Sequence, residues 1–167
     1  MKDKPLLYVR ALLLCIPLIW AAASATAQGT NISFGSFKSD PTLPVEVTAD
    51  TLDVDQSSGA ATFVGNVLIG QGEMRLAAAK VLVVYNQDSS GIDRLEATGG
   101  VTLVSGPDAA EAERADYTID DGLIVMNGNV LLTQGPSTLS ADSMTVNLIT
   151  GTAQMVGRVK TILNTGD

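Results

Sequence analysis

The chain has 167 residues, of which 46% are hydrophobic but only 4% aromatic, and it contains no histidine and one cysteine. These counts exclude a Ser-His-Asp or Cys-His nucleophile, a zinc site built from Cys and His ligands, and a disulfide framework. The formal net charge of −8 disfavours nucleic acid and anionic membrane surfaces as partners.

Residues 1–27 have the layout of a secretory signal peptide. A basic start precedes an apolar run over residues 11–23, which is shorter than the roughly 20 residues that a membrane-spanning helix needs. The run leads to Ala25-Thr26-Ala27, a small-residue cleavage site typical of bacterial export. Cleavage before Gln28 removes Cys15 and leaves seven basic and 17 acidic residues, a net charge of −10.

The remaining chain divides into a leader and one domain. Residues 28–44 are rich in Gly, Ser, Thr, Asn and Pro, a composition that predicts a flexible leader. The folded domain is expected over residues 45–167, enough for a single hydrophobic core.

A two-part pattern recurs four times in this domain. Its second part begins with Gly65, Gly99, Gly128 and Gly157, which are 34, 29 and 29 residues apart. Ahead of each glycine stands an Ala-containing marker: Ala49-Asp50, Ala79-Lys80, Ala115-Asp116 and Ala141-Asp142. Four copies at a nearly constant period predict a repeat architecture.

Within each unit the apolar residues alternate with polar ones, which is the period of a β-strand with one buried face. In the first unit the apolar positions are Phe63, Val67 and Ile69, and the strand after Lys80 is expected to bury Leu82 and Val84. After the third marker the apolar residues are shifted by one position relative to the other units, which predicts a β-bulge near Asp116. Residues 109–115 are expected to form one helical turn.

Gly- and Pro-containing turns separate these strands, so about ten antiparallel strands are expected. Their common apolar face has to be covered, either by two sheets closing on each other or by one sheet folding over into a V-shaped roll. The repeat favours hairpins stacked along an axis. The sequence therefore predicts an all-β fold, an elongated twisted β-jelly roll of stacked antiparallel hairpins that is open-ended.

Four segments of the domain follow one another in a recognisable order: the segment 45–50, Gly65-Asn66-Val67 with Gln71-Gly72, the strand 76–85, and Gly128-Asn129-Val130 with Gln134-Gly135. In this order they resemble the OstA-like family of periplasmic lipopolysaccharide-transport proteins of Gram-negative bacteria. It implies a periplasmic protein that binds lipopolysaccharide and joins an inner-membrane transport complex to an outer-membrane assembly complex. It also implies head-to-tail self-association through the strands at the two ends of the domain.

The same resemblance implies a lipid-binding site on the inward side of the matched strands. The acyl chains would contact an apolar trough whose lining residues are Val47, Leu52, Val54, Phe63, Val67, Ile69, Leu76, Val101, Leu103, Met126, Val130 and Leu132.

Other functions remain as alternatives. A sandwich core has the same alternating pattern as a lipid trough, so a periplasmic β-sandwich scaffold that binds no lipid is the main rival. Asp53 with Asp55, and Asp120 with Asp121, are suited to calcium, but Asp is also a common turn residue and the spacing does not recur. The same carboxylates lack an aromatic sugar platform for glycoside hydrolysis. We therefore expect no cofactor, no metal and no enzymatic activity.

Overall fold

The computed structural model describes residues 30–33, 37, 40–55, 57, 59–86 and 91–162, and for residues 30–33 it describes the backbone alone. The signal peptide expected over residues 1–27 lies outside the described residues.

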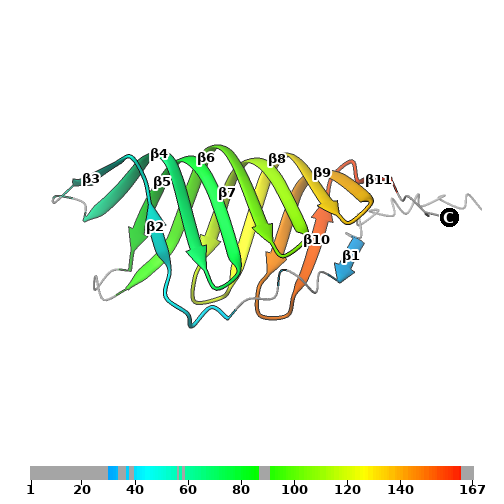
Figure 1. The fold of residues 1–167 in the computed structure, drawn as a ribbon, viewed down its shortest axis with the longest axis horizontal. Coiled ribbons are helices and arrows are strands. Elements are labelled where there is room, and N and C mark those ends of the chain that lie inside the picture. The colour runs from blue at the N-terminus through cyan, green and yellow to red at the C-terminus, as the bar shows by residue number, and fades with distance from the viewer. Residues whose placement is uncertain are drawn as a thin grey trace, which may run out of the picture.

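The described chain forms one 11-stranded antiparallel sheet (Figure 1). The main path follows the order β1-β10-β9-β8-β7-β6-β5-β4-β2, while β3 pairs with β4 and β11 pairs with β9. From β4 to β10, each strand pairs with the next one in sequence, so the predicted stack of hairpins is confirmed. The strands are β1 (Thr30–Ser33), β2 (Glu46–Thr48), β3 (Thr51–Asp55), β4 (Ala60–Gln71), β5 (Met74–Tyr85), β6 (Ile92–Ser105), β7 (Asp108–Thr118), β8 (Leu123–Gln134), β9 (Ser137–Asn147), β10 (Thr152–Val156) and β11 (Lys160–Ile162).

A glycine-containing pair interrupts the ladder once in each unit. The pairs are Gly65-Asn66, Gly99-Gly100, Gly128-Asn129 and Gly157-Arg158, and all eight residues have positive φ. In β4, β6 and β8 the pair adds one residue relative to the neighbouring strands, which is the pattern of a β-bulge. The long strands bend over along the upper side of Figure 1, and both halves descend to turns on the lower side.

Glycine is required at these bends because the facing strand comes close. A Cβ added to Gly128 would lie 2.6 Å from the Glu113 carboxylate, and φ there is +87°. Asn129 follows with a φ of 47°, and its side-chain amide donates a 2.7 Å hydrogen bond to Glu113 Oε1. Asparagine tolerates the left-handed conformation better than most residues. In the same way, the side-chain amide of Asn66 donates a 2.8 Å hydrogen bond to Asp50 Oδ2.

The bends divide the sheet into two facing layers. Layer 1 contains β2, β11 and the strand halves that meet at turns such as Gly72–Glu73; layer 2 contains β1, β3, β10 and the opposite halves. Alternate residues of both layers point inward, where they form one continuous hydrophobic cluster. The predicted open-ended jelly roll is therefore confirmed.

The bends also correct the repeat alignment. The residues facing Gly99 and Gly128 are Ala79 and Glu113, not Lys80 and Asp116. Counting two and four residues onward from Ala79 gives Val81 and Val83, which are buried, whereas Leu82 and Val84 are only partly buried. The register around Asp116 is continuous, so the bulge predicted there is wrong, and the real one lies opposite Glu113 at Gly128-Asn129.

The helical turn predicted for residues 109–115 is also wrong. This segment lies within β7, which pairs with β6 on one side and β8 on the other. Its Ala- and Glu-rich composition favours a helix locally, but pairing along both edges satisfies its backbone groups and buries Ala110 and Ala115.

Part of the expected leader over residues 28–44 has a defined position. β1 pairs antiparallel with β10 at one end of the sheet, with Thr30 opposite Met155 and Ser33 opposite Thr152. Phe37 is completely buried and belongs to the hydrophobic cluster. Residues 40–45 lead to β2, at the other end of the sheet (Figure 1).

Candidate functional site

The interior between the layers is an apolar column that runs along the whole stack. Layer 1 contributes pairs such as Val67 and Ile69, and layer 2 contributes pairs such as Val81 and Val83. Each strand half adds two or three inward residues at alternate positions, and the bend keeps the same face inward on both sides. The inward residues at the middle of the stack are mostly aliphatic, with Met126 and Met144 among them. This chemistry suits an apolar ligand.

The structure places all twelve predicted residues on the inward faces of the two layers. Eight are buried in the middle of the stack: Val67, Ile69, Leu76, Val101, Leu103, Met126, Val130 and Leu132. Val47 and Phe63 are partly buried and pack against this cluster. Leu52 and Val54 are exposed, at 52% and 62%.

The twelve predicted lipid-binding residues leave out about half of the column, mostly in layer 2. Val81 and Val83 were missed because the marker was set one residue too late. On β7, counting two and four residues onward from Glu113, which faces Gly128, gives the inward Ala115 and Tyr117. The inward residues of layer 2 outside the predicted lipid-binding set include Ala61, Leu95, Ala97, Ala115, Tyr117, Ile124, Met144, Val146, Ala153 and Met155.

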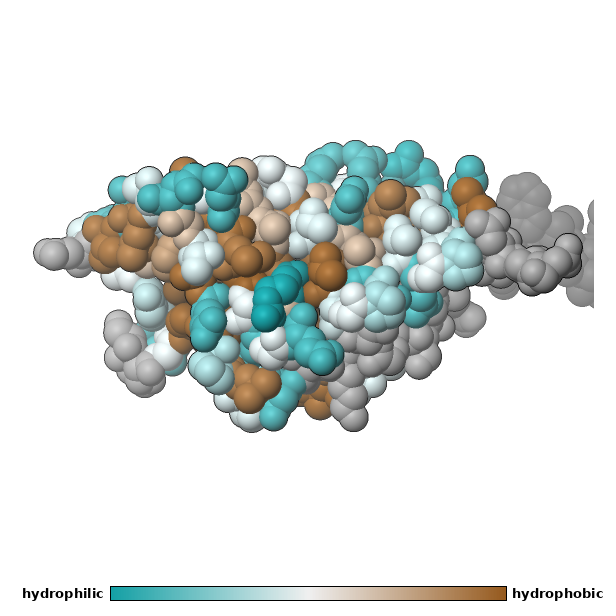
Figure 2. Space-filling model, viewed as in Figure 1, coloured by the Kyte–Doolittle hydropathy of each residue, from teal (hydrophilic) through white to brown (hydrophobic). Residues whose placement is uncertain are grey.

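The column is filled in the middle and open at the β3 end. In the middle, inward side chains of the two layers pack together with 0–2% exposure at most positions. At the β3 end, Leu52 and Val54 face inward, opposite Phe63 and Ala61 in register, and remain exposed. Figure 2 shows apolar residues gathered at this end of the visible face. An apolar ligand can therefore contact the column at the β3 end without any rearrangement, but in the middle only if the layers separate.

A buried polar network joins the two layers near the lower turns. Gln71 ends the layer 1 half of β4, and Tyr117 lies in the layer 2 half of β7; both are 1% exposed. The Tyr117 hydroxyl donates a hydrogen bond to Gln71 Oε1. Gln71 Nε2 in turn donates to the backbone oxygens of Pro41 and Leu43, at 3.0 and 2.9 Å. Burial raises the pKa of Tyr117 to about 12, against a smaller lowering by the bond to Gln71.

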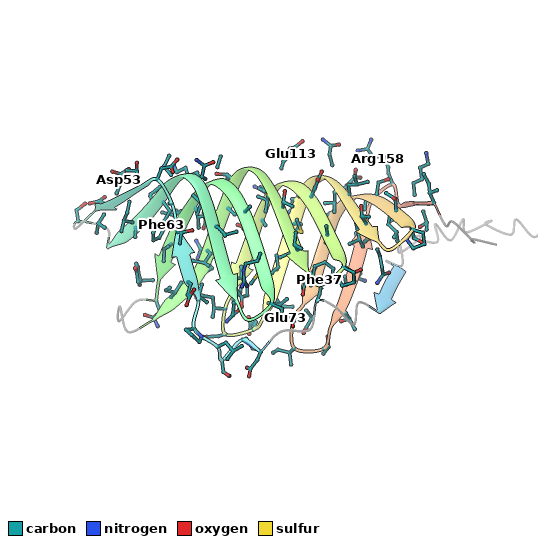
Figure 3. The ribbon with its side chains drawn as sticks, in the orientation of Figure 1. Phe37, Asp53, Phe63, Glu73, Glu113 and Arg158 are labelled. Carbon is teal, nitrogen blue, oxygen red and sulfur yellow. The ribbon has the colours of Figure 1, made fainter. Side chains whose placement is uncertain are left out.

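The outward faces of the two ends carry opposite charges. On β3, Asp53 and Asp55 alternate with the inward Leu52 and Val54. At the other end, Arg158 and Lys160 are exposed, and Arg158 binds Asp142 with an Nη2–Oδ1 distance of 2.5 Å. That bond lowers the pKa of Asp142. Figure 3 shows Asp53 and Arg158 at opposite ends of the upper ridge.

Metal-binding clusters and membrane-spanning helices are absent from the described ranges. There, no group of three or more His, Cys, Asp or Glu side chains is placed to hold a metal ion. No helix in the same part of the chain has the length and apolar character needed to cross a membrane.

Comparison with known proteins identifies related chains. A family model described as LptA/(LptD N-terminal domain) LPS transport protein matches residues 46–152. An uncharacterized protein of Rhizobium meliloti is 28% identical over 142 residues, covering 80% of this chain and 76% of that protein. The lipopolysaccharide export system protein LptA of Escherichia coli K12 is 25% identical over 112 residues, which span 64% of this chain and 60% of the relative.

A second LptA and a solved structure are also similar to this chain. The lipopolysaccharide export system protein LptA of Haemophilus influenzae is 27% identical over 131 residues, covering 74% of this chain and 76% of that protein. The crystal structure of LptH, described as the LptA-homologous periplasmic component of the lipopolysaccharide transport device of Pseudomonas aeruginosa, superimposes with a TM-score of 0.67. It covers 75% of this chain and 99% of LptH at 17% identity, and at that identity it supports the fold alone.

Proposed function

The chain belongs to the LptA/(LptD N-terminal domain) LPS transport protein family, and from this premise we propose that it binds lipopolysaccharide in the periplasm and shields its acyl chains in the interior column. The observation that carries the proposal is the apolar column, which is continuous along the stack and open at the β3 end. The twelve inward residues predicted from the sequence are the proposed contacts.

Shielding is what the chemistry of the cargo demands. Burying one methylene group is worth about 0.8 kcal/mol, so leaving a dodecyl chain in water costs on the order of 9 kcal/mol. A carrier that crosses an aqueous compartment therefore has to cover the chains throughout. Transfer from a bilayer into an apolar column is roughly neutral by the same reasoning, so this step needs no energy source in the chain itself.

The filled middle of the column sets the mechanism of binding. The inward side chains there already bury one another, so an acyl chain replaces contacts between the layers by contacts with itself. The apolar area in contact with water changes little in this exchange, and Met126 and Met144 can adapt their shape to the guest. The glycine pairs are the natural hinges because all of them lie on the bend between the layers. Binding begins at the exposed Leu52 and Val54 and proceeds by separation of the layers.

The ends of the stack support the proposed bridge between an inner-membrane transport complex and an outer-membrane assembly complex. Among the described strands, β2, β3 and β11 each pair on one side only, and exposed strand edges tend to pair with other chains. Asp53 and Asp55 at one end complement Lys160 at the other, where Arg158 is already paired with Asp142. A head-to-tail contact of this kind does not close on itself and so extends into a filament. Such a filament would continue the apolar column from one copy to the next.

Photo-crosslinking to lipopolysaccharide tests the proposed site. A photoreactive phenylalanine at Phe63 is expected to crosslink to purified lipopolysaccharide, because this partly buried ring faces the column near its open end. The matched control is the same substitution at Val64, the next residue, which is 39% exposed on the outward face. Labelling is read by gel shift and mass spectrometry.

The pattern of labelling separates the two candidate functions. Crosslinks from Phe63 but not from Val64 support lipid binding in the column. The filled middle of the column also favours a scaffold that binds no lipid. Absence of crosslinks from both positions, with no lipid bound to the purified native protein, would establish that alternative.

A further inference from the structure

The N-terminal arm makes two contacts with the interior that the transport proposal does not use. We define the arm by its described parts: β1, Phe37 and residues 40–45. Phe37 is the one aromatic side chain of the arm among the described residues, and it is 0% exposed within the hydrophobic cluster. Figure 3 shows it near the lower side of the molecule, on the segment between β1 and β2. Phe37 therefore fills interior volume although it belongs to none of the stacked hairpins.

The second contact is the hydrogen bonding of Gln71. Its amide donates to the backbone oxygens of Pro41 and Leu43, and its carbonyl accepts from Tyr117 in the opposite layer. The Gln71 side chain of layer 1 is thus hydrogen-bonded to both the arm and layer 2. If the layers separate at this point, the Gln71–Tyr117 bond has to break. Its two polar groups then need new partners, because buried polar groups left unpaired are costly.

We propose that the N-terminal arm is a releasable closure of the interior: Phe37 occupies space that an acyl chain takes when it is bound, and Gln71 is the latch that ties the arm to both layers. The proposal rests on the proposed function, since it concerns access to that same column. In the closed state the middle of the column is filled by the protein's own side chains. Release of the arm removes Phe37 and frees Gln71, which allows the layers to part.

The structure favours an arm that can detach without unfolding the domain. β1 is four residues long and pairs with one strand, β10, and short edge strands contribute little independent stability. The consecutive pairings that join β4 to β10 do not involve β1. Detachment is therefore local. If the competent open state is a minor population, the apparent affinity for lipid is reduced by its fraction.

A disulfide lock tests the closure. Ile32 and Ala153 lie directly opposite each other in the β1–β10 pair, and replacing both by Cys introduces a cross-strand pair into a chain whose one other cysteine is Cys15. The control is a lock at Thr133 and Thr138, which are opposite each other in the β8–β9 hairpin. Uptake of fluorescently labelled lipopolysaccharide is timed in the oxidised and reduced forms of both variants.

We expect oxidation of the Ile32→Cys/Ala153→Cys variant to slow uptake by about tenfold or more, because the competent fraction falls, while the control lock changes little. Phe37→Ala is expected to accelerate uptake, and far-UV circular dichroism checks that it folds. Equal rates for the oxidised and reduced arm lock overturn the proposal, and so does an unchanged rate for folded Phe37→Ala. Failure of the proposed function is distinct: no form of the protein, reduced or oxidised, then takes up lipid.

Discussion

The inward residues of the apolar column are exposed at one end of the stack and buried at the other. At the β3 end, Leu52 and Val54 face inward and are 52% and 62% exposed. At the β10 end, Met155 occupies the equivalent inward face and is 0% exposed. The difference lies in the neighbouring strand: β10 has β1 on its outer edge, whereas β3 pairs with β4 alone among the described strands.

This difference makes the two ends of a regular repeat distinguishable. The four units are built alike, so nothing in a single hairpin distinguishes one end of the column from the other. The N-terminal arm makes the distinction by covering the edge of β10, whereas no strand in the described part of the chain covers the edge of β3. A ligand or a partner strand therefore meets an accessible end and a covered one.

The largest expected effect comes from placing a charge on the column at each end. Met155→Asp puts a carboxylate at a fully buried site without a partner and should lower the free energy of unfolding by about 3–4 kcal/mol. Val54→Asp, on the same face at the open end, should change it by less than about 0.5 kcal/mol. Urea denaturation of both variants measures the contrast. Equal losses would mean that the β3 end is covered in solution.

A second prediction concerns the contact that keeps the layers together between the two ends. Tyr117 has its pKa raised from 10.0 to about 12 by burial. Below pH 10 its hydroxyl is neutral in both the folded and unfolded states. Between about pH 10 and 12 the unfolded state loses this proton first, so stability falls by about 2–3 kcal/mol.

The variant Tyr117→Phe should lack this alkaline loss, although it is less stable at neutral pH by about 1 kcal/mol because Gln71 loses a partner. Unfolding followed by circular dichroism from pH 8 to 12 measures both slopes. Tyr85→Phe, at a site that is 40% exposed, is the control. If Tyr117→Phe and the unsubstituted protein lose stability equally between about pH 10 and 12, a group other than Tyr117 causes the loss.

The smallest expected effect is on self-association at the open end. Leu52→Asp removes an exposed apolar side chain from the proposed end contact and adds a charge. Its association constant should fall about tenfold, or about 1.4 kcal/mol. Leu68→Asp, at a similarly exposed residue on the outward face of β4, is the control and should associate normally. Sedimentation velocity over a concentration series compares the two, and equal weakening would argue against an end-to-end contact through β3.

The stacked hairpins were predictable because their signals are local. Gly65-Asn66 and Gly128-Asn129 recur with alternating apolar residues on either side, so the units and most layer 1 contacts could be found from the sequence. The strand halves of layer 2 were set less accurately, since a one-residue error at Lys80 moves a whole strand to the wrong face. That error assigned Leu82 and Val84 to the interior in place of Val81 and Val83.

The N-terminal arm was beyond sequence reasoning for a different reason. Its pairing joins Thr30 to Met155, residues far apart in the chain, and nothing in the composition of residues 28–44 specifies that partner. Phe37 lies outside the repeat, in a segment without the alternating pattern of the hairpins, so its burial depends on the assembled stack. Gln71 and Tyr117 likewise meet only when the layers face each other.

The recurring glycine pairs make the length of this protein adjustable in fixed increments. A unit of 29 residues adds two strands to the stack, which is about 10 Å of reach at ordinary strand spacing. Inserting or deleting a whole unit preserves the ridge of bends and its inward columns. Inserting half a unit would reverse the strand direction at the terminus and leave the last edge facing the wrong way for its neighbour. The span of such a protein can therefore change by whole repeats without disturbing the sheet.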